Sequence, residues 1–171
     1  MNVFVLSPSP RKSAELLCDR HVVKMTLETA QILSTGYWLA NMPLPVASGL
    51  YKPTHKDHPC VLGTVLDPAY RHWVYLHGLA LADEYELRYS KVHKSRGVLE
   101  HPLIRAWAEA TREGTWHGLS ARFPMAMPDI YRQGREGRVC EAYRAYYIGE
   151  KANQLWAKWA TGRRDRPPIF V

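Results

Sequence analysis

The segment CDRHVVKMTLE, residues 18–28, contains a histidine and a carboxylate at a spacing that suits acid–base chemistry. In a helix, His21 and Glu28 lie on the same face, about 10 Å apart along the axis, on an otherwise apolar stripe. They are too far apart to hydrogen-bond each other, but a small group between them could contact both. Buried ionisable groups are costly unless they are paired or used. The spacing therefore predicts either a catalytic pair beside a pocket or two residues satisfied elsewhere in the core, for example by Arg71 or Tyr143.

A second candidate is YKPTHKDHP, residues 51–59, a proline-stiffened loop with four possible cations: Lys52, His55, Lys56 and His58. Several donors that converge without a regular backbone suit a phosphate group. The HxxH spacing could instead bind a metal ion if Glu28 or His21 supplied a third ligand. A solvated basic loop without a ligand is the third interpretation.

A third candidate is AYRAYYIGEK, residues 142–151, which places tyrosines beside basic side chains. Tyrosine rings can stack against a base while cations hold its phosphates. Buried core tyrosines would explain the same residues equally well. We assign substrate or phosphate contacts to a basic and aromatic set: Lys24, Tyr143, Arg144, Tyr147 and Lys151.

A stripe that includes Trp73 repeats the seven-residue spacing, from His77 to Glu84. Arg88 follows Glu84 by four positions, which is the ordinary arrangement of an ion pair on a helix surface. We expect a surface ion pair here rather than a site.

The hydrophobic pattern that positions these residues predicts a mainly α-helical protein, one domain over residues 1–171 with two long irregular loops. The apolar segment NVFVL, residues 2–6, is expected to be a buried extended arm. The expected helices run from Ser7 or Ser9 to about Ala40 with a break near Asp19, from Pro68 after an Asp67 cap to about Val92, over 101–114, and over 138–160. The expected loops are 41–59 and 115–137.

The formal charge of +7, from 23 Lys and Arg against 16 Asp and Glu, favours a polyanionic partner, nucleic acid first. No P-loop, GxGxxG, GxSxG or CxxC motif is present, which disfavours nucleotide-cofactor folds, serine hydrolases and cysteine zinc sites. No signal peptide or membrane-spanning run is evident, so we expect a soluble intracellular protein without a membrane partner. The cysteines are expected to be small buried thiols in a reducing cytoplasm: Cys18, Cys60 and Cys140.

The segment LLCDRHVVKMTLETAQ resembles the first helix of the phage pyrimidine-dimer glycosylases of the endonuclease V type. Those small all-helical enzymes carry Asp-x-His and a catalytic glutamate seven residues after the histidine, a pattern that Asp19, His21 and Glu28 match. HPCVLG followed by YRHWVYLHGLALADEYELRY is similar to the second segment of that family in order and spacing. The resemblance covers about the first half of the chain and implies an endonuclease V-like fold that acts on DNA.

The sequence departs from that family's pattern at functional positions. The family attacks the sugar with the amine of an N-terminal threonine, whereas here Met1 is followed by Asn2. The arginines that flank the family's glutamate correspond to Leu27 and Gln31. These replacements argue against glycosylase and lyase chemistry by the same route.

A second resemblance covers more of the chain. CDRHVVKM, YKPTHKDHP, AMPDIY and AYRAYYIGEK are similar to phage proteins associated with the amino acid:DNA transferases of thymine hypermodification. This resemblance implies an enzyme of the host cytoplasm that displaces pyrophosphate from 5-pyrophosphoryloxymethyl-uracil in DNA, with a free amino acid as nucleophile. Glu28 or His21 would deprotonate the amino acid, and cations of the 51–59 loop, with Mg²⁺ as a candidate cofactor, would stabilise the leaving pyrophosphate.

The main functional prediction is therefore such a transferase on DNA. The alternatives are a pyrimidine-dimer glycosylase with a changed nucleophile and a non-catalytic basic DNA-binding module. In the transferase the target base would be flipped onto aromatic side chains such as Trp38, Tyr143 or Tyr147. The basic C-terminal tail would follow the DNA backbone through Arg163, Arg164 and Arg166.

Overall fold

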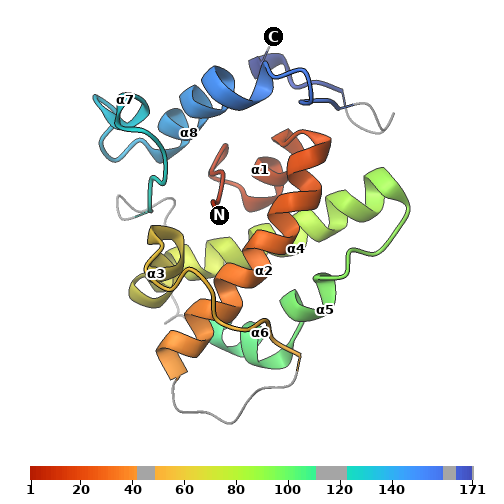
Figure 1. Cartoon of the computed structure of the whole chain (residues 1–171), viewed down its shortest axis with the longest axis vertical. Helices are drawn as coiled ribbons and strands as arrows, with labels where there is room; N and C mark the ends of the chain where they lie inside the picture. The colour runs from red at the N-terminus through yellow and green to blue at the C-terminus, as the bar shows by residue number, and fades with distance from the viewer. Residues whose placement is uncertain (42–48, 111–122, 160–164, 171) are drawn as a thin grey trace.

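Helix α2 (Asp19–Asn41) lies at the centre of the computed structural model, where α3, α4, α5 and α6 pack against it (Figure 1). The structure describes residues 1–41, 49–110, 123–159 and 165–170, and within these ranges the regular structure is helical, with no strand. The other elements are α1 (Pro10–Leu16), α3 (Pro59–Leu66), α4 (Pro68–Tyr89), α5 (Arg96–Leu99), α6 (Pro102–Glu109), α7 (Asp129–Arg132), α8 (Val139–Tyr147), the π-helix η1 (Ile148–Ala152) and the 3-10 helix η2 (Pro168–Phe170). The all-α prediction is confirmed, while the extent of the single domain stays a prediction.

The predicted break near Asp19 separates α1 from α2. Helix α1 begins after Ser9, whose hydroxyl accepts a hydrogen bond from the Lys12 amide at 3.3 Å, and Pro10 occupies its first turn. Helix α2 begins at Asp19, and an acidic residue in the first turn is favoured by the helix dipole. The break allows α1 to pack on α4 while α2 runs through the core.

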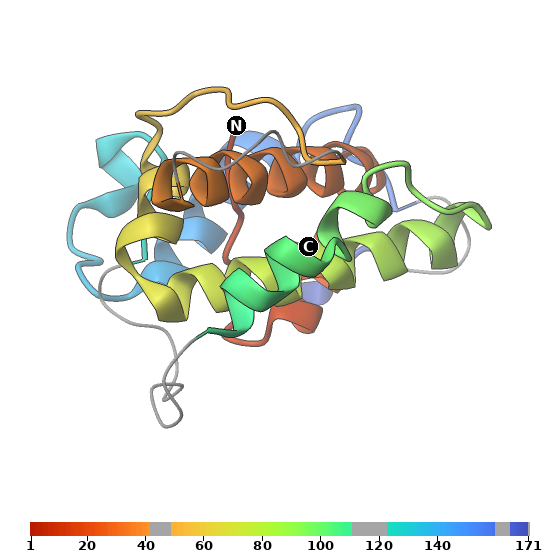
Figure 2. The same ribbon diagram turned by 90° about the horizontal axis from the view of Figure 1, so that it is seen from below.

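Helix α4 begins where the sequence predicted, because the Asp67 carboxylate accepts hydrogen bonds from the amides of Ala69 and Tyr70 at 2.9 and 3.2 Å. It ends at Tyr89, close to the predicted end. Figure 2 shows α2 in one layer, with α4 and α6 in a second layer beneath it. The packing of α2 against α4, the two long helices, forms much of the core.

Helix α3 was not predicted as a separate element. It begins at Pro59, at the end of the predicted loop, and its N-cap is His58, whose ring nitrogen Nδ1 accepts the Cys60 N–H at 3.1 Å. Residues 42–48 of the predicted loop lie outside the described part of the chain, whereas residues 49–58 are irregular, as predicted. Amides of this described part donate hydrogen bonds to Ser34 and Thr35 of α2.

The N-terminal segment is the predicted buried extended arm, since Val3 to Leu6 are all at most 4% exposed. The Ser13 hydroxyl donates to the Phe4 carbonyl at 2.8 Å and accepts from the Leu6 amide at 2.9 Å. Arg144 donates from Nε to the Leu6 carbonyl at 2.7 Å. The arm therefore lies between α1 and α8, and Arg144 is engaged in holding it.

The C-terminal helix is shorter than predicted. Helix α8 ends at Tyr147 and continues only through the π-helix to Ala152, so the segment around Trp156 and Trp159 is not helical. The reason is tertiary: the Trp159 indole donates to the Leu16 carbonyl at 3.3 Å, and the Lys158 carbonyl accepts the Asp19 amide at 2.8 Å. These long-range bonds fix the segment against the α1–α2 junction and override its local helix preference.

The predictions for one helix, one loop and the cysteines are each correct only in part. Helix α6 ends at Glu109, short of the predicted end at 114, and residues 111–122 lie outside the described part of the chain. A short helix, α7, interrupts the predicted loop 115–137. All three cysteines are free, and two are buried as expected, whereas Cys140 is partly exposed.

Across the described ranges, none of the helices combines the length and apolarity that crossing a bilayer requires.

Candidate active site

The Glu28 carboxylate contacts the first two residues of the chain, and Glu28 itself is only 8% exposed. Its Oε2 accepts a hydrogen bond from the main-chain N–H of Asn2 at 2.9 Å. The N-terminal ammonium of Met1 lies 3.8 Å from the same oxygen. The ammonium of Lys24, one turn earlier on α2, lies 3.2 Å from Oε1. An amine beside a carboxylate is the pair that an amine nucleophile and its proton-transfer partner require.

The side chain of Asn2 fixes the first residues in this position. Its amide nitrogen donates to the Ala126 carbonyl at 2.8 Å, and its Oδ1 accepts from the Tyr143 hydroxyl at 3.1 Å. Oδ1 also accepts the Val3 amide at 2.7 Å. The start of the chain is therefore attached to α8 and to the segment before α7, as well as to α2.

His21 lies on the same face of α2 as Glu28 and is 6% exposed. Its Nδ1 is 2.8 Å from the hydroxyl of Tyr147, and its ring stacks on Phe4 with the ring centres 5.0 Å apart. Burial lowers the pKa of His21 to about 4, with smaller contributions from the charges of Lys151 and Lys24. The ring is therefore neutral at pH 7. A core residue does bond to His21, as the alternative interpretation expects, but that residue is Tyr147 rather than Arg71 or Tyr143.

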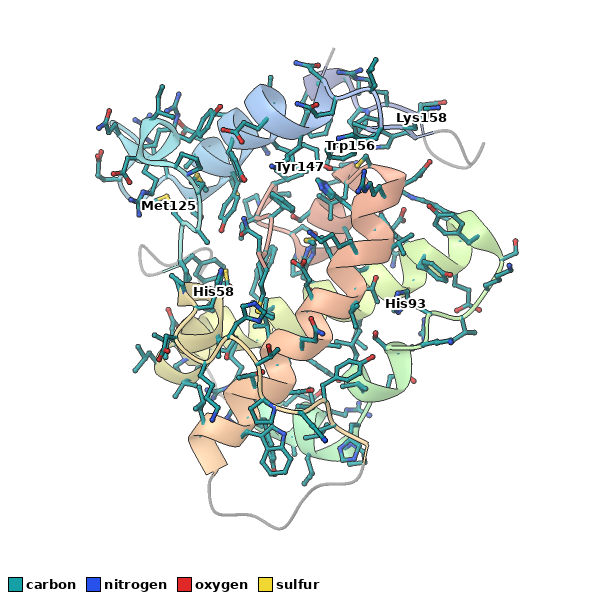
Figure 3. All side chains as sticks on the ribbon, in the orientation of Figure 1. His58, His93, Met125, Tyr147, Trp156 and Lys158 are labelled. Atoms are coloured by element: carbon teal, nitrogen blue, oxygen red, sulfur yellow. The ribbon has the colours of Figure 1, made fainter. Side chains whose placement is uncertain are left out.

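His21 and Glu28 line one pocket, of about 180 Å³, between α2, the N-terminal arm and the end of α8. Figure 3 shows Tyr147 and Trp156 near the N-terminal end of α2, and His58 at the start of α3. The pocket is positively charged, because it contains one carboxylate, that of Glu28, and the ammonium groups of Met1, Lys24 and Lys151. Besides Met1 and Asn2, its lining includes Phe4, His21, Lys24, Glu28, Tyr146 and Lys151.

Lys24 and Lys151 are the two predicted substrate contacts that the structure brings to this pocket. The Lys24 side chain is 59% exposed. Lys151 lies on the π-helix, with its ammonium 5.0 Å from the centre of the Tyr146 ring. π-Helical turns occur frequently at functional sites. Both ammonium groups can therefore reach an anion at the pocket mouth.

The predicted phosphate loop is only partly near the pocket. Lys52, His55 and Lys56 are exposed and do not line it. His58 is half-buried, and its pKa is lowered by burial and by the nearby charge of the N-terminus. Of the four loop residues, His58 is the one placed beside the first residue of the chain.

Tyr143 and Tyr147 are fully buried, which differs from the expected contact with a flipped base. Their rings pack in the core, and their hydroxyls hold Asn2 and His21 respectively. Burial raises the pKa of each phenol well above its ordinary value. Trp38 is also buried and donates to the Tyr51 carbonyl. Neither tyrosine can stack against a base in this position, so these residues act on the site through other groups.

The stripe on α4 also differs from its expectation. Glu84 and Arg88 do form an ion pair, with 3.0 Å between Arg88 Nη2 and Glu84 Oε2, but the two residues are 5% and 4% exposed. Arg88 also contacts the Asp19 carboxylate at 3.1 Å. The pair is therefore a buried support of the α1–α2 junction and not a surface pair.

In the part of the chain that the structure describes, no three His, Cys, Asp or Glu side chains are placed so that they could hold a metal ion together. The HxxH pair is engaged locally, because His58 Nδ1 accepts the Cys60 amide and His55 Nδ1 contacts the Thr54 hydroxyl at 2.8 Å. The described residues therefore do not fit a metal site built from this motif. Of the tail arginines, Arg163 and Arg164 lie outside the described residues, and Arg166 is bonded to Asn153 and to the Phe170 carbonyl.

A larger hollow of about 430 Å³ lies beside Leu27, and Tyr51, Tyr85 and His93 are among its lining residues. Its lining contains no carboxylate. His93 Nδ1 accepts the Ser95 amide at 3.1 Å. This hollow therefore lacks the acid–base pair that the smaller pocket contains.

Sequence reasoning missed the main-chain nitrogens of Met1 and Asn2 as functional groups. They have no side-chain signature, and the only pointer was the N-terminal nucleophile of the resembling glycosylases. At that position Asn2 was interpreted as a departure, whereas its side chain proves to anchor the start of the chain.

Comparison with known families agrees with the first resemblance. Residues 1–98 match the family described as pyrimidine dimer DNA glycosylase, which is more than half of the 171 residues. The match includes Met1, Asn2, His21 and Glu28, and it supports DNA as the partner of an enzyme. Comparisons with curated proteins and with solved structures found no match. The chain belongs to the pyrimidine dimer DNA glycosylase family.

Proposed function

We propose that this protein is a DNA glycosylase that uses the main-chain amine at the start of the chain as its nucleophile. The observation that carries the proposal is the position of that amine, 3.8 Å from the Glu28 carboxylate in a cationic pocket. Family membership supports the same class of reaction. The main prediction from sequence, a transferase, becomes the second candidate.

The reaction follows from the groups in the pocket. The amine, once it has lost a proton, attacks C1′ of the damaged nucleotide, and the bond from C1′ to the base nitrogen breaks. The base leaves with the bonding electrons and takes up a proton. The sugar ring opens as an imine forms between C1′ and the amine nitrogen. Loss of a proton from C2′ then eliminates the 3′ phosphate, which nicks the strand. Glu28 is the group within reach to accept and return the protons, and such a role contributes about 10²–10⁴-fold to rate.

The neutral His21 and the two lysines have separate parts in this proposal. With Nδ1 bonded to Tyr147, His21 can present Nε2–H as a donor to an oxygen of the opening sugar. Lys24 and Lys151 hold the phosphates on either side of the target nucleotide. They thereby stand in for the flanking arginines that Leu27 and Gln31 replace.

The test uses duplex DNA irradiated with ultraviolet light and borohydride to trap the imine. The wild-type protein is expected to nick the strand and to form a covalent adduct on its N-terminal peptide. Glu28→Gln should lose activity by about 10²–10⁴-fold. The matched control is Glu141→Gln, which removes a carboxylate from an exposed ion pair with Arg138. Absence of both nicking and adduct with the wild-type protein would exclude the proposal.

The second candidate is the transfer of a free amino acid onto 5-pyrophosphoryloxymethyl-uracil in DNA, in the host cytoplasm. It is favoured by the absence of the flanking arginines and by the pair of lysines at the pocket, which could hold the leaving pyrophosphate with Mg²⁺ bound to it. Glu28 would then deprotonate the ammonium of the amino acid. Mass analysis of nucleosides, after incubation of the pyrophosphorylated DNA with each amino acid, separates this reaction from base excision. A binding module without catalysis would give neither product.

A further inference from the structure

Two amines contact the Glu28 carboxylate, one at each of its oxygens. The N-terminal ammonium of Met1 lies 3.8 Å from Oε2, and the ammonium of Lys24 lies 3.2 Å from Oε1. Both residues line the pocket of about 180 Å³. Base excision uses the first amine as nucleophile and leaves the second as a cation. Because either oxygen of a carboxylate can take up a proton, Glu28 is within reach to accept a proton from Lys24 as well as from Met1.

A second lysine of the chain shows what is particular to Lys24. Lys12 forms a nearly identical ion pair on α1, with its ammonium 3.2 Å from Glu15 Oε2. The side chains of Lys12 and Lys24 are 61% and 59% exposed. The difference lies in the carboxylate, because Glu28 lines the pocket and Glu15 does not. Of these two lysines, only Lys24 can therefore pass a proton to a carboxylate inside a cavity.

Lys151, the other lysine of the pocket, has different surroundings. Its ammonium lies 3.9 Å from Glu150 Oε2 and 5.0 Å from the centre of the Tyr146 ring. Glu150 does not line the pocket. The acid–base partner of a second reaction is therefore placed at Lys24 and not at Lys151.

We propose that Lys24 is a second amine nucleophile of this pocket, which forms an imine with the aldehyde of an abasic site in DNA and cleaves the strand there. An abasic sugar opens to expose an aldehyde at C1′, where no base has to leave. Lysine amines form imines with carbonyl substrates once they have lost a proton. The proposal rests on the proposed function for the position of the DNA sugar and for Glu28 as the proton carrier. During base excision Lys24 keeps its other part, as a cation at a phosphate.

The reaction needs no co-reactant other than water. The Lys24 ammonium gives a proton to Glu28, and its nitrogen forms a bond to C1′ while the carbonyl electrons move to the oxygen, which becomes a hydroxyl. Glu28 returns the proton as this hydroxyl leaves as water, which gives a protonated imine. Loss of a proton from C2′ then expels the 3′ phosphate with the bonding electrons and breaks the strand. Hydrolysis of the imine frees the lysine.

The experiment blocks the N-terminal amine and leaves the rest of the chain intact. Protein acetylated only at the Met1 nitrogen, as checked by intact mass and peptide mapping, is incubated with duplex DNA that carries an abasic site, and borohydride traps the imine. Lys24→Arg keeps a positive charge beside Glu28 but replaces the amine by a guanidinium, which does not lose its proton in proteins. Lys12→Arg is the matched control, because Lys12 has the same ion-pair distance and a similar exposure outside the pocket.

We expect the acetylated protein to retain imine trapping and strand cleavage at the abasic site, with the adduct on the peptide that contains Lys24. In the acetylated protein, Lys24→Arg should slow trapping by about 10²-fold, the order of effect that loss of a correctly placed reacting group has, and Lys12→Arg should leave it unchanged. The Kd for the abasic DNA should change by less than about twofold in both variants, because the charge is kept.

A failure of this proposal can be told from a failure of the proposed function. An N-terminal adduct of the unblocked protein with irradiated DNA, together with loss of all trapping on acetylation, would exclude Lys24 alone. Equal slowing by Lys24→Arg and Lys12→Arg, or an adduct on another lysine, would also exclude it. An adduct of the unblocked protein with irradiated DNA on Lys24 instead of the N-terminus would overturn the proposed nucleophile and support Lys24. No adduct with either DNA would exclude both proposals.

Discussion

The hydroxyl oxygen of Tyr147 lies 2.8 Å from Nδ1 of His21 and accepts the main-chain N–H of Cys18 at 3.0 Å. A phenol has one hydrogen to donate. Because the Cys18 amide is a donor, the Tyr147 hydrogen is available to the imidazole, which then carries its own proton on Nε2. We therefore predict that Tyr147 sets the tautomer of His21.

Replacing Tyr147 with phenylalanine should therefore disturb stability and tautomer together. The variant leaves the Cys18 amide and His21 Nδ1 without this partner in a buried place, which should reduce the free energy of unfolding by about 1–3 kcal/mol. Denaturant titration measures the stability. The nitrogen chemical shifts of His21 report the tautomer, and shifts identical to those of the wild-type protein would contradict this assignment.

Two buried histidines should make stability depend on pH. His77 is 1% exposed, and burial lowers its pKa to about 4; the pKa of His21 is also lowered to about 4. In the unfolded chain both take up protons near the ordinary value of about 6.5. As the pH falls from about 6.5 to 4, only the unfolded state gains these protons, so stability is lost in that window. For His77 the loss amounts to about 3 kcal/mol at pH 4.

The control for this effect is His77→Gln, which keeps a donor for the Pro10 carbonyl but does not titrate. The free energy of unfolding, measured by denaturant titration at several pH values, should fall less steeply for this variant between pH 6 and 4. Parallel curves for the variant and the wild-type protein would show that His77 does not contribute.

The buried Arg88 should contribute far more to the free energy of unfolding than the more exposed Arg96. It is buried and bonds to Asp19, to Glu84 and to two main-chain carbonyls of the α1–α2 junction. Arg88→Met should cost roughly 3–5 kcal/mol, because it leaves buried carboxylates uncompensated. Arg96→Met is the control, since its partners are exposed and such pairs contribute about 0–1 kcal/mol. Equal losses in the two variants would contradict the role given to the buried network.

The parts of the fold set by local chemistry could be predicted from the sequence. Ser9 with Pro10, and Asp67 with Pro68, mark helix starts because the cap and the proline act on their immediate neighbours. The end of the last helix could not be predicted, because Trp159 and Lys158 bond to a junction near the start of the chain. Such long-range bonds override local helix preference.

The candidate site also combines features that are local in the sequence with contacts that are remote in it. The spacing of His21 and Glu28 on one helix face is a local property, and both residues do line one pocket. Their partners are remote: Tyr147 is 126 positions from His21, and Asn2 is 26 positions from Glu28. Only the folded chain shows that the main-chain nitrogen at its start reaches the carboxylate.

The two lysines at the pocket should control the salt dependence of DNA binding. If Lys24 and Lys151 each contact one phosphate, replacing either with glutamine should reduce the slope of log Kd against log salt concentration by about 0.9. Lys12→Gln on α1 is the control, because Lys12 pairs with Glu15 and does not line the pocket. Lys24→Gln has a second effect: it removes a cation 3.2 Å from the Glu28 carboxylate, so it should also change the rate of catalysis. Titrations of irradiated DNA at several salt concentrations measure the slopes, and unchanged slopes in both variants would remove the lysines from the DNA contact.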